Sequence, residues 1–176
     1  MIHAALMAAL TAVGAYIAIP VGPVPIVLQN MFVLLAGLLL GSRWGLVSMG
    51  IYVLAGIMGL PVFAGGTGGV GRFFGPTGGY LLTYPAVAYL VGFISEKGGH
   101  RVVTDVFAMM AGMALTYAVG VPWLAMVTGM SLTKAVAVGL IPFIPGCFIK
   151  VAAAAFIARA MRPLMILSPH SELSRN

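Results

Sequence analysis

Six long apolar segments, separated by clusters of Gly, Pro or charged residues, leave this chain few ways to fold. Two stretches within them, 31–40 and 106–121, are apolar around almost the whole circumference of a helix, as helices that face lipid are. Only 7% of the residues are charged, against roughly 25% in a soluble domain. We therefore predict an all-α membrane protein, a compact bundle of six transmembrane helices. The expected spans are 2–19, 29–41, 44–60, 78–95, 104–121 and 137–162.

The bundle is expected to form a single domain, residues 1–165, followed by a polar cytoplasmic tail, residues 166–176. A bundle of this size cannot be divided without leaving single helices. Several segments are shorter than the ~20 residues of a perpendicular span, so they are tilted, half-buried or completed by loops. The first segment starts at Ile2 without a preceding basic region or cleavage site, and we interpret it as a span and not as a signal peptide.

The basic residues decide the expected orientation in the membrane, because Lys and Arg concentrate on the cytoplasmic side. A cytoplasmic N-terminus places six of them inside and three outside, which predicts that both termini are cytoplasmic. The inner set is Arg43, Lys97, Arg101, Arg159, Arg162 and Arg175, and the outer set is Arg72, Lys134 and Lys150. The Gly- and Pro-rich loops 20–26, 61–79 and 122–145 then lie outside. The net charge of +6 reflects this placement and not nucleic-acid binding, because the cations are scattered singly.

The loop 61–79 is unusual because eight of its nineteen residues are glycine, while others, such as Phe63 and Phe74, are large and apolar. A flexible tether, the alternative interpretation, has no need of such side chains. Irregular backbone at membrane depth is tolerated only where protein or an aqueous cavity covers it. We therefore expect the loop to fold back over the bundle. Arg72 within it either pairs with lipid headgroups or closes over an acidic ligand.

Lys150 lies four residues after Gly146, in about the first turn of the final span. An ammonium group that faces lipid costs about 3 kcal/mol at the bilayer centre, so we expect Lys150 to face a cavity or a partner. The unpaired N–H groups and the positive dipole end at a helix start favour an anion at the same place. The alternative is that Lys150 snorkels to the outer headgroups.

Polar and aromatic side chains near the outer ends of other segments are further candidates for ligand contacts. Gln29 and Asn30 open the second segment, where their amides either cap the helix or present donors and acceptors to a ligand. Tyr80, Tyr84 and Trp123 lie near the outer ends of their segments, where aromatic residues also form an interfacial belt.

Small residues recur every four positions in the first segment, at Ala4, Ala8 and Ala12. This spacing places them on one stripe of a helix, where the lack of bulk lets a second helix approach closely. The stripe either packs within the chain or forms a docking face for another subunit.

Catalytic and metal-binding signatures are missing from the sequence, which has no His-Glu-x-x-His, Gly-x-Ser-x-Gly or Walker-type phosphate loop. The three histidines and three acidic residues fall near the expected cytoplasmic side, so a membrane enzyme acting on lipids would lack an acid or base. The single cysteine, Cys147, excludes an intramolecular disulfide and a cysteine zinc cluster. We therefore expect neither an enzyme nor a metal or cofactor site.

Four strings in order along the chain resemble the BioY family, the biotin-specific S components of energy-coupling factor transporters. The strings are GPVPIVLQ at 22–29, GLPVFAGGTGG at 59–69, GPTGGYL at 75–81 and PFIPGCFIK at 142–150. They run over nearly the whole chain, and the GLPVF and GPTGGY pieces are specific to the family.

The resemblance implies a six-helix S-component fold in a prokaryotic plasma membrane, with a biotin pocket near the outer face that loops close. It also implies a transmembrane T component, docked on the alanine stripe, and two ATP-binding subunits. Lys150 matches the family's lysine, and the other residues in or near segments that resemble pocket-forming ones are Gln29, Gly66, Thr67, Arg72, Tyr80 and Trp123. A carrier that needs no partners, and an S component for another vitamin, remain alternatives.

Cys147 is the one departure from the family pattern, which is similar to Pro-Gly-Asp-x-x-Lys and places an aspartate at this position. An aspartate accepts hydrogen bonds from the ureido N–H groups of biotin, whereas a thiol is a weak acceptor. A charged hydrogen bond lost at a buried site costs roughly 1.5–3 kcal/mol, about tenfold or more in affinity. The departure therefore implies a lower affinity, a substitute group or a changed specificity.

Overall fold

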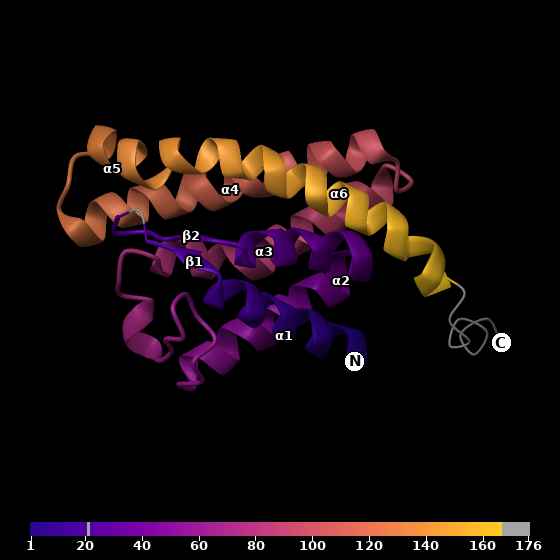
Figure 1. The fold of residues 1–176 in the computed structure, drawn as a ribbon, viewed down its shortest axis with the longest axis horizontal. Helices are drawn as coiled ribbons and strands as arrows, with labels where there is room; N and C mark the ends of the chain where they lie inside the picture. Colours follow the sequence, from indigo (N-terminus) through magenta and orange to yellow (C-terminus); the bar gives the residue numbers. More distant parts are fainter. Residues whose placement is uncertain (21, 167–176) are drawn as a thin grey trace.

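The computed structural model describes residues 1–20 and 22–166, with the side chains of 164–166 left aside, and it is almost entirely helical (Figure 1). The predicted tail, 166–176, lies almost wholly outside the described residues. The long helices are α1 (Ile2–Tyr16), α2 (Gln29–Ile57), α3 (Gly78–Lys97), α4 (Val102–Thr128) and α6 (Ile144–Ile166). Shorter elements are β1 (Ala18–Ile19), β2 (Ile26–Val27), the 3₁₀ turns η1 (Val70–Arg72) and η2 (Ile141–Phe143), and α5 (Leu132–Gly139).

Within the described residues, four stretches are long and apolar enough to cross a membrane. They are α2, α3, α4 and the stretch that runs from α5 into α6, whereas α1 is shorter. Together with the apolar surface of the other helices, these stretches make a helical membrane protein, as the composition predicts.

Gly41 interrupts α2 with backbone angles, φ 80° and ψ −179°, that no helix contains. A Cβ added at Gly45 would lie 3.1 Å from the carbonyl oxygen of Ala36, nine residues earlier. Nine residues of unbroken helix would span about 13.5 Å, so the chain reverses direction at Gly41. A positive φ of this kind favours glycine, which explains why the break falls there.

Glu96 on α3 caps the second half of α2 just after this break. Its two carboxylate oxygens accept hydrogen bonds from the backbone N–H of Ser42, at 2.8 Å, and from the Ser42 hydroxyl, at 2.9 Å. The N-terminal N–H groups of a helix have no partner within it, so a carboxylate from a neighbouring helix stabilises this start. The α2 and α3 backbones approach closely here, because a Cβ at Gly92 would lie 2.4 Å from the Ser42 nitrogen.

The prediction that residues 122–145 form an outer loop is wrong, because most of them are helical. Helix α4 continues through Pro122 to Thr128 and ends at Gly129, whose left-handed φ of 68° is typical of a helix terminus. The side chains of Val121 and Leu124 are buried on either side of the proline, and their packing stabilises the helix through it. The predicted segment 137–162 is also not one unbroken helix, because α6 starts at Ile144, after α5 and η2.

Arg162 on α6 forms the densest polar cluster among the described residues. Its guanidinium forms a salt bridge of 2.5 Å with Asp105 on α4 and donates to the Ser95 hydroxyl on α3 at 3.0 Å. It also donates to the carbonyl oxygens of Leu38 and His100. Asp105 is therefore a buried acid, whereas the sequence led us to expect no buried acid, and Arg162 neutralises it. The cluster holds four segments together at one end of the bundle.

Candidate ligand cavity

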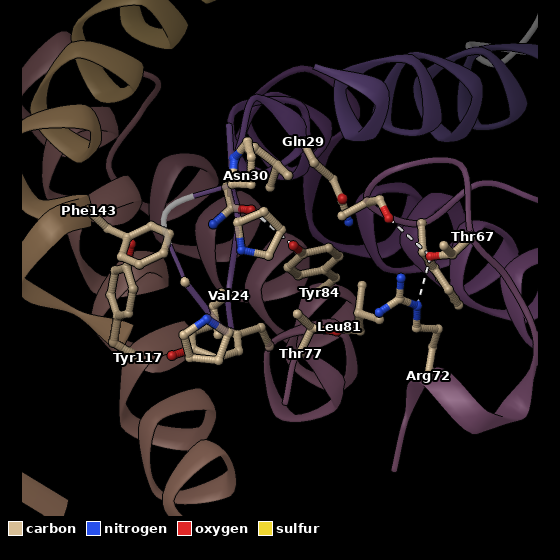
Figure 2. Close-up of a pocket in the computed structure, with 18 of the residues that line it drawn as sticks. Val24, Gln29, Asn30, Thr67, Arg72, Thr77, Leu81, Tyr84, Tyr117 and Phe143 are labelled. Carbon is tan, nitrogen blue, oxygen red and sulfur yellow. Dashed lines mark hydrogen bonds between the residues drawn. The ribbon is translucent and has the colours of Figure 1, made fainter. Parts of the chain in front are cut away.

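A cavity of about 280 Å³ lies at the other end of the bundle, near the lower limit of the ~300–1,000 Å³ typical of small-molecule sites. Two coil segments line it, 20–28 before α2 and 61–77 between α2 and α3, together with residues of α3, α4 and α6 (Figure 2). The lining residues are Pro20, Gly22, Pro23, Val24, Pro25, Val27, Gln29, Asn30, Phe63, Ala64, Thr67, Arg72, Thr77, Tyr80, Leu81, Tyr84, Tyr117, Phe143 and Lys150.

Two cations line this cavity, and no carboxylate of the described residues lies beside them. Lys150 is only 7% exposed, and it forms no hydrogen bond or salt bridge with any described side chain. Arg72 donates through Nε to the Thr67 hydroxyl at 2.8 Å, which leaves its two terminal nitrogens without a hydrogen bond to the described residues. The two described acids, Glu96 and Asp105, are engaged at the opposite end. The cavity is therefore electropositive and suited to an anion.

The sequence suggested that Lys150 lies in about the first turn of the last helix, but in the structure it lies beyond that turn. Helix α6 begins at Ile144, so Lys150 is its seventh residue and lies beyond the turn whose N–H groups are unpaired. The attraction for an anion at this point comes from the ammonium group itself, and not from the helix start. Pro145 belongs to the first turn of α6, where a proline is well tolerated because its missing N–H would have no partner.

Gln29 is the second unusual group in the cavity wall. Its side chain is 1% exposed, and its Nε2 has no hydrogen-bond partner, the one such buried side-chain atom found among the described residues. The neighbouring Asn30 accepts a hydrogen bond from the Tyr84 hydroxyl at 2.9 Å, which fixes the orientation of its amide. A buried donor without an acceptor costs free energy, so a ligand that brings an acceptor here would be favoured.

Aromatic rings close the side of the cavity that faces α4 and α6. Figure 2 shows Tyr117 and Phe143 on this side, across the cavity from Gln29, Thr67 and Arg72. The rings of Tyr117 and Phe143 lie 6.2 Å apart, and Tyr80 packs edge-on against Tyr117 at 6.1 Å. Such a wall suits an apolar body between the polar groups of a ligand.

The structure brings five of the eight candidate site residues into the cavity wall. They are Gln29, Thr67, Arg72, Tyr80 and Lys150. The hydroxyl of Tyr80 donates a hydrogen bond to the carbonyl oxygen of Gly139 at 3.0 Å. Its hydrogen is therefore not free to bind a ligand, and Tyr80 contributes its ring to the cavity wall.

The three other candidates lie beside the cavity. The Cys147 sulfur is 3.2 Å from the hydroxyl of Tyr117, and Gly66 packs on the ring of Tyr16. The indole N–H of Trp123 donates to the carbonyl oxygen of Gly75 at 3.1 Å, so Trp123 anchors the glycine-rich loop to α4.

Sequence reasoning missed Tyr117 and Phe143. Phe143 lies inside the matched string 142–150, which offered a signal for it. Tyr117 stands in an apolar helix without any distinguishing pattern, and only the packing of α4 against α6 reveals its place.

The alanine stripe of α1 is packed largely within the chain. Ala4 and Ala8 are buried and Ala12 is half-buried, and the carbonyl oxygen of Ala4 accepts a hydrogen bond from Ser48 on α2 at 2.7 Å. In this structure the stripe follows the internal-packing interpretation, and a docking role for it remains a prediction. The exposed side of α1 carries Ala5 and Ala9 instead.

A comparison with family models matches residues 1–166 to the BioY family. The chain belongs to the BioY family. The resemblance drawn from the four sequence strings is thereby confirmed. Curated relatives include a probable biotin transporter BioY of Pyrococcus horikoshii, 44% identical over 121 residues, with 69% of this chain and 71% of the relative covered. A biotin transporter BioY of Thermotoga maritima is 43% identical over 126 residues, with the same coverage.

A solved structure extends the BioY match to the fold. The crystal structure of the S-component for biotin from an ECF-type ABC transporter superposes with a TM-score of 0.86 at 33% identity, covering 92% of this chain and 89% of the other. The relatives are transporters and not enzymes, as the missing catalytic motifs predict. The bacterial and archaeal BioY relatives, together with the apolar helices, make this chain a multi-pass membrane protein.

Proposed function

We propose that this chain is the substrate-binding S component of a biotin transporter, which captures biotin from outside the cell. The T component and two ATP-binding subunits of an ECF transporter would then drive its passage inward. The membership in the BioY family and the likeness to an S-component for biotin support this proposal.

The observation that carries the proposal is a cavity with two cations and one buried amide donor that have no carboxylate or acceptor partner, respectively, among the described residues. Biotin has one carboxylate, one ureido carbonyl and an apolar body between them. The carboxylate satisfies Lys150 or Arg72, the carbonyl oxygen satisfies Gln29 Nε2, and the rings of Tyr80, Tyr117 and Phe143 cover the rest.

We further propose six transmembrane helices, in a prokaryotic plasma membrane, with both termini cytoplasmic. The reversal at Gly41 supports the count, because it divides α2 into two antiparallel segments. Figure 1 supports placing both termini on one side of the membrane, because the N-terminus and the end of α6 lie toward the same end of the bundle, opposite the 61–77 loop. The placement of Lys and Arg favours the cytoplasm as that side.

The partner subunits need a face of this chain to contact, and we propose the exposed side of α1. Ala5, Ala9 and Val13 lie on one exposed stripe, and small residues there let another helix approach closely. Co-purification of the chain with candidate T and ATP-binding subunits tests the assembly. Biotin uptake in cells that lack those subunits would favour the alternative of a self-sufficient carrier.

Binding of radiolabelled biotin to the purified chain tests the proposed function directly. We expect saturable binding that unlabelled biotin displaces and other vitamins do not. A lack of saturable binding at micromolar biotin would reject the proposal, and displacement by another vitamin would favour an S component of different specificity.

Replacement of Gln29 by leucine is expected to lower the affinity for biotin without lowering the thermal stability of the protein. The affinity for biotin should fall roughly 2- to 12-fold, the value of one neutral hydrogen bond. The thermal stability without ligand should stay equal or rise, because no described residue accepts a hydrogen bond from the lost donor. Isothermal titration and thermal unfolding in detergent measure the two quantities. A parallel loss of both would mean that Gln29 serves the fold alone.

Replacement of Cys147 by aspartate distinguishes two orientations of biotin, because residue 147 lies one turn before Lys150 on α6. The affinity should rise about tenfold where the ureido ring lies beside residue 147, and it should fall where the carboxylate of biotin pairs with Lys150. The new carboxylate would stand beside Tyr117, where Cys147 now lies, and would supply an acceptor that the thiol provides poorly. The control is Cys147→Ser, which adds a hydroxyl without charge and should change the affinity little. Equal affinities for the wild type and the aspartate variant would show that the departure from the family pattern carries no cost.

A further inference from the structure

Tyr16, at the last turn of α1, is the feature that the proposed binding site leaves unexplained. Its side chain is 57% exposed, yet its hydroxyl donates a 2.7 Å hydrogen bond to the carbonyl oxygen of Pro61, 45 residues later. One residue earlier, the carbonyl oxygen of Ala15 accepts from the backbone N–H of Gly65 at 3.3 Å. The end of α1 therefore holds the 61–77 loop at two points.

Next to the second point, Gly66 at the tip of the loop packs on the tyrosine ring. A Cβ added at Gly66 would lie 3.1 Å from Cε1 of Tyr16, and Gly66 itself has a φ of 70°. The position therefore requires glycine for two reasons, its backbone angle and its close approach to the ring. Other contacts hold the start and the end of the loop, through Tyr52 with Val62 at 2.8 Å and Trp123 with Gly75 at 3.1 Å.

The supported tip is the part of the loop that reaches the cavity. Ala64 and Thr67 line the cavity, and the Thr67 hydroxyl donates to the carbonyl oxygen of Ala64 at 3.0 Å. The same hydroxyl accepts from Arg72 Nε at 2.8 Å, which positions one of the two cavity cations. A continuous set of contacts thus runs from the ring of Tyr16 through the tip to the Arg72 guanidinium.

The coil after α1 joins the opposite wall of the cavity in a similar way. Ala18 pairs with Val27 in the β1–β2 ladder, and the backbone N–H of Leu28 donates to the carbonyl oxygen of Ile17 at 3.2 Å. Gln29 follows directly. The last turn of α1 and the two residues after it therefore contact the two segments that line the cavity.

We propose that Tyr16 is a positioning residue that holds the loop tip 64–67 over the cavity and so sets the rate at which biotin leaves. This inference rests on the proposed function, because it takes biotin as the ligand. The contact is a single hydrogen bond and one ring face at an exposed position, so it can open without disturbing the buried core. Tyr16 also lies on the exposed stripe with Ala9 and Val13, where a subunit contacting α1 would reach it.

The test is the dissociation rate of radiolabelled biotin from purified Tyr16→Phe and Tyr16→Ala variants. An ordinary hydrogen bond corresponds to roughly 2- to 12-fold in an equilibrium constant, so we expect Tyr16→Phe to accelerate dissociation by about threefold to tenfold. Tyr16→Ala, which also removes the ring, should accelerate it further. The control is Tyr89→Phe, because Tyr89 is also exposed but its hydroxyl forms no hydrogen bond with the described residues.

A second measurement separates this role from a general loss of stability. Amide hydrogen exchange in residues 63–72 of ligand-free protein should increase in both Tyr16 variants, while exchange in α3 and the unfolding temperature stay unchanged. Unchanged dissociation together with unchanged loop exchange would overturn the proposal. If the wild type binds no biotin, the proposed function fails, whereas the exchange measurement still decides whether Tyr16 holds the loop.

Discussion

Replacement of Lys150 by methionine is expected to weaken biotin binding by roughly 10- to 100-fold, the value of a buried charged hydrogen bond. Lys150 lines the cavity, is 7% exposed and has no carboxylate partner among the described residues. Biotin carries one negative charge, on its carboxylate, and that group can neutralise the ammonium. Methionine keeps the length and apolar stem of the side chain, so the change removes charge more than volume. Equilibrium binding of radiolabelled biotin measures the loss.

The control for this change is Lys134→Met on α5, because Lys134 is exposed and lies outside the cavity wall. A neutral ester of biotin provides the second control. The wild type should bind the ester much more weakly than biotin, whereas the Lys150 variant should show little difference between the two ligands, since the charge pair is already lost. A preference for biotin over its ester that survives in the variant would assign the carboxylate to Arg72 instead.

Replacement of Arg162 by methionine is expected to destabilise the fold by about 3–5 kcal/mol, because it leaves a buried carboxylate without its counterion. The side chain of Asp105 is only 5% exposed, and it pairs with Arg162 through both guanidinium nitrogens. The donors to Ser95 and to the carbonyl oxygens of Leu38 and His100 are lost as well. Unfolding by heat or denaturant in detergent micelles measures the effect.

Arg159→Met is the matched control, because Arg159 lies one turn earlier on α6 and is exposed. The double variant Arg162→Met with Asp105→Leu should recover much of the lost stability, since it removes the unpaired acid together with the base. The folded fraction of each variant should keep its biotin affinity, because the cluster lies at the other end of the bundle from the cavity. An equally stable Arg162→Met variant would show that the ion pair contributes little.

Local patterns in the sequence predicted the membrane class and several positions of the cavity wall. The apolar segments and the absence of charge within them follow directly from the chemistry of the bilayer, which admits few alternatives. Gly41 could be expected as a break, because charge and glycine cluster around it. Lys150 stood out because a lone ammonium in an apolar helix needs a cavity or a partner.

Features that depend on tertiary packing could not be predicted in this way. Pro122 marked a boundary in the sequence, yet buried neighbours carry α4 past it for six more residues, to Thr128. Asp105 and Arg162 are 57 residues apart, and no local sequence pattern predicts that they form a salt bridge. Tyr117 reaches the cavity because α4 packs against α6, a contact that a single sequence does not reveal.

The carboxylate of Glu96 that caps Ser42 has a consequence for biosynthesis. During translation, Ser42, at the start of the second half of α2, leaves the ribosome 54 residues before Glu96 does. Until α3 arrives, the first N–H groups of that half-helix have no carboxylate to accept from them, which is costly wherever lipid replaces water. The hairpin around Gly41 therefore gains its final partner only when α3 inserts beside it, so insertion of α3 and completion of the α2 hairpin are expected to occur as one step.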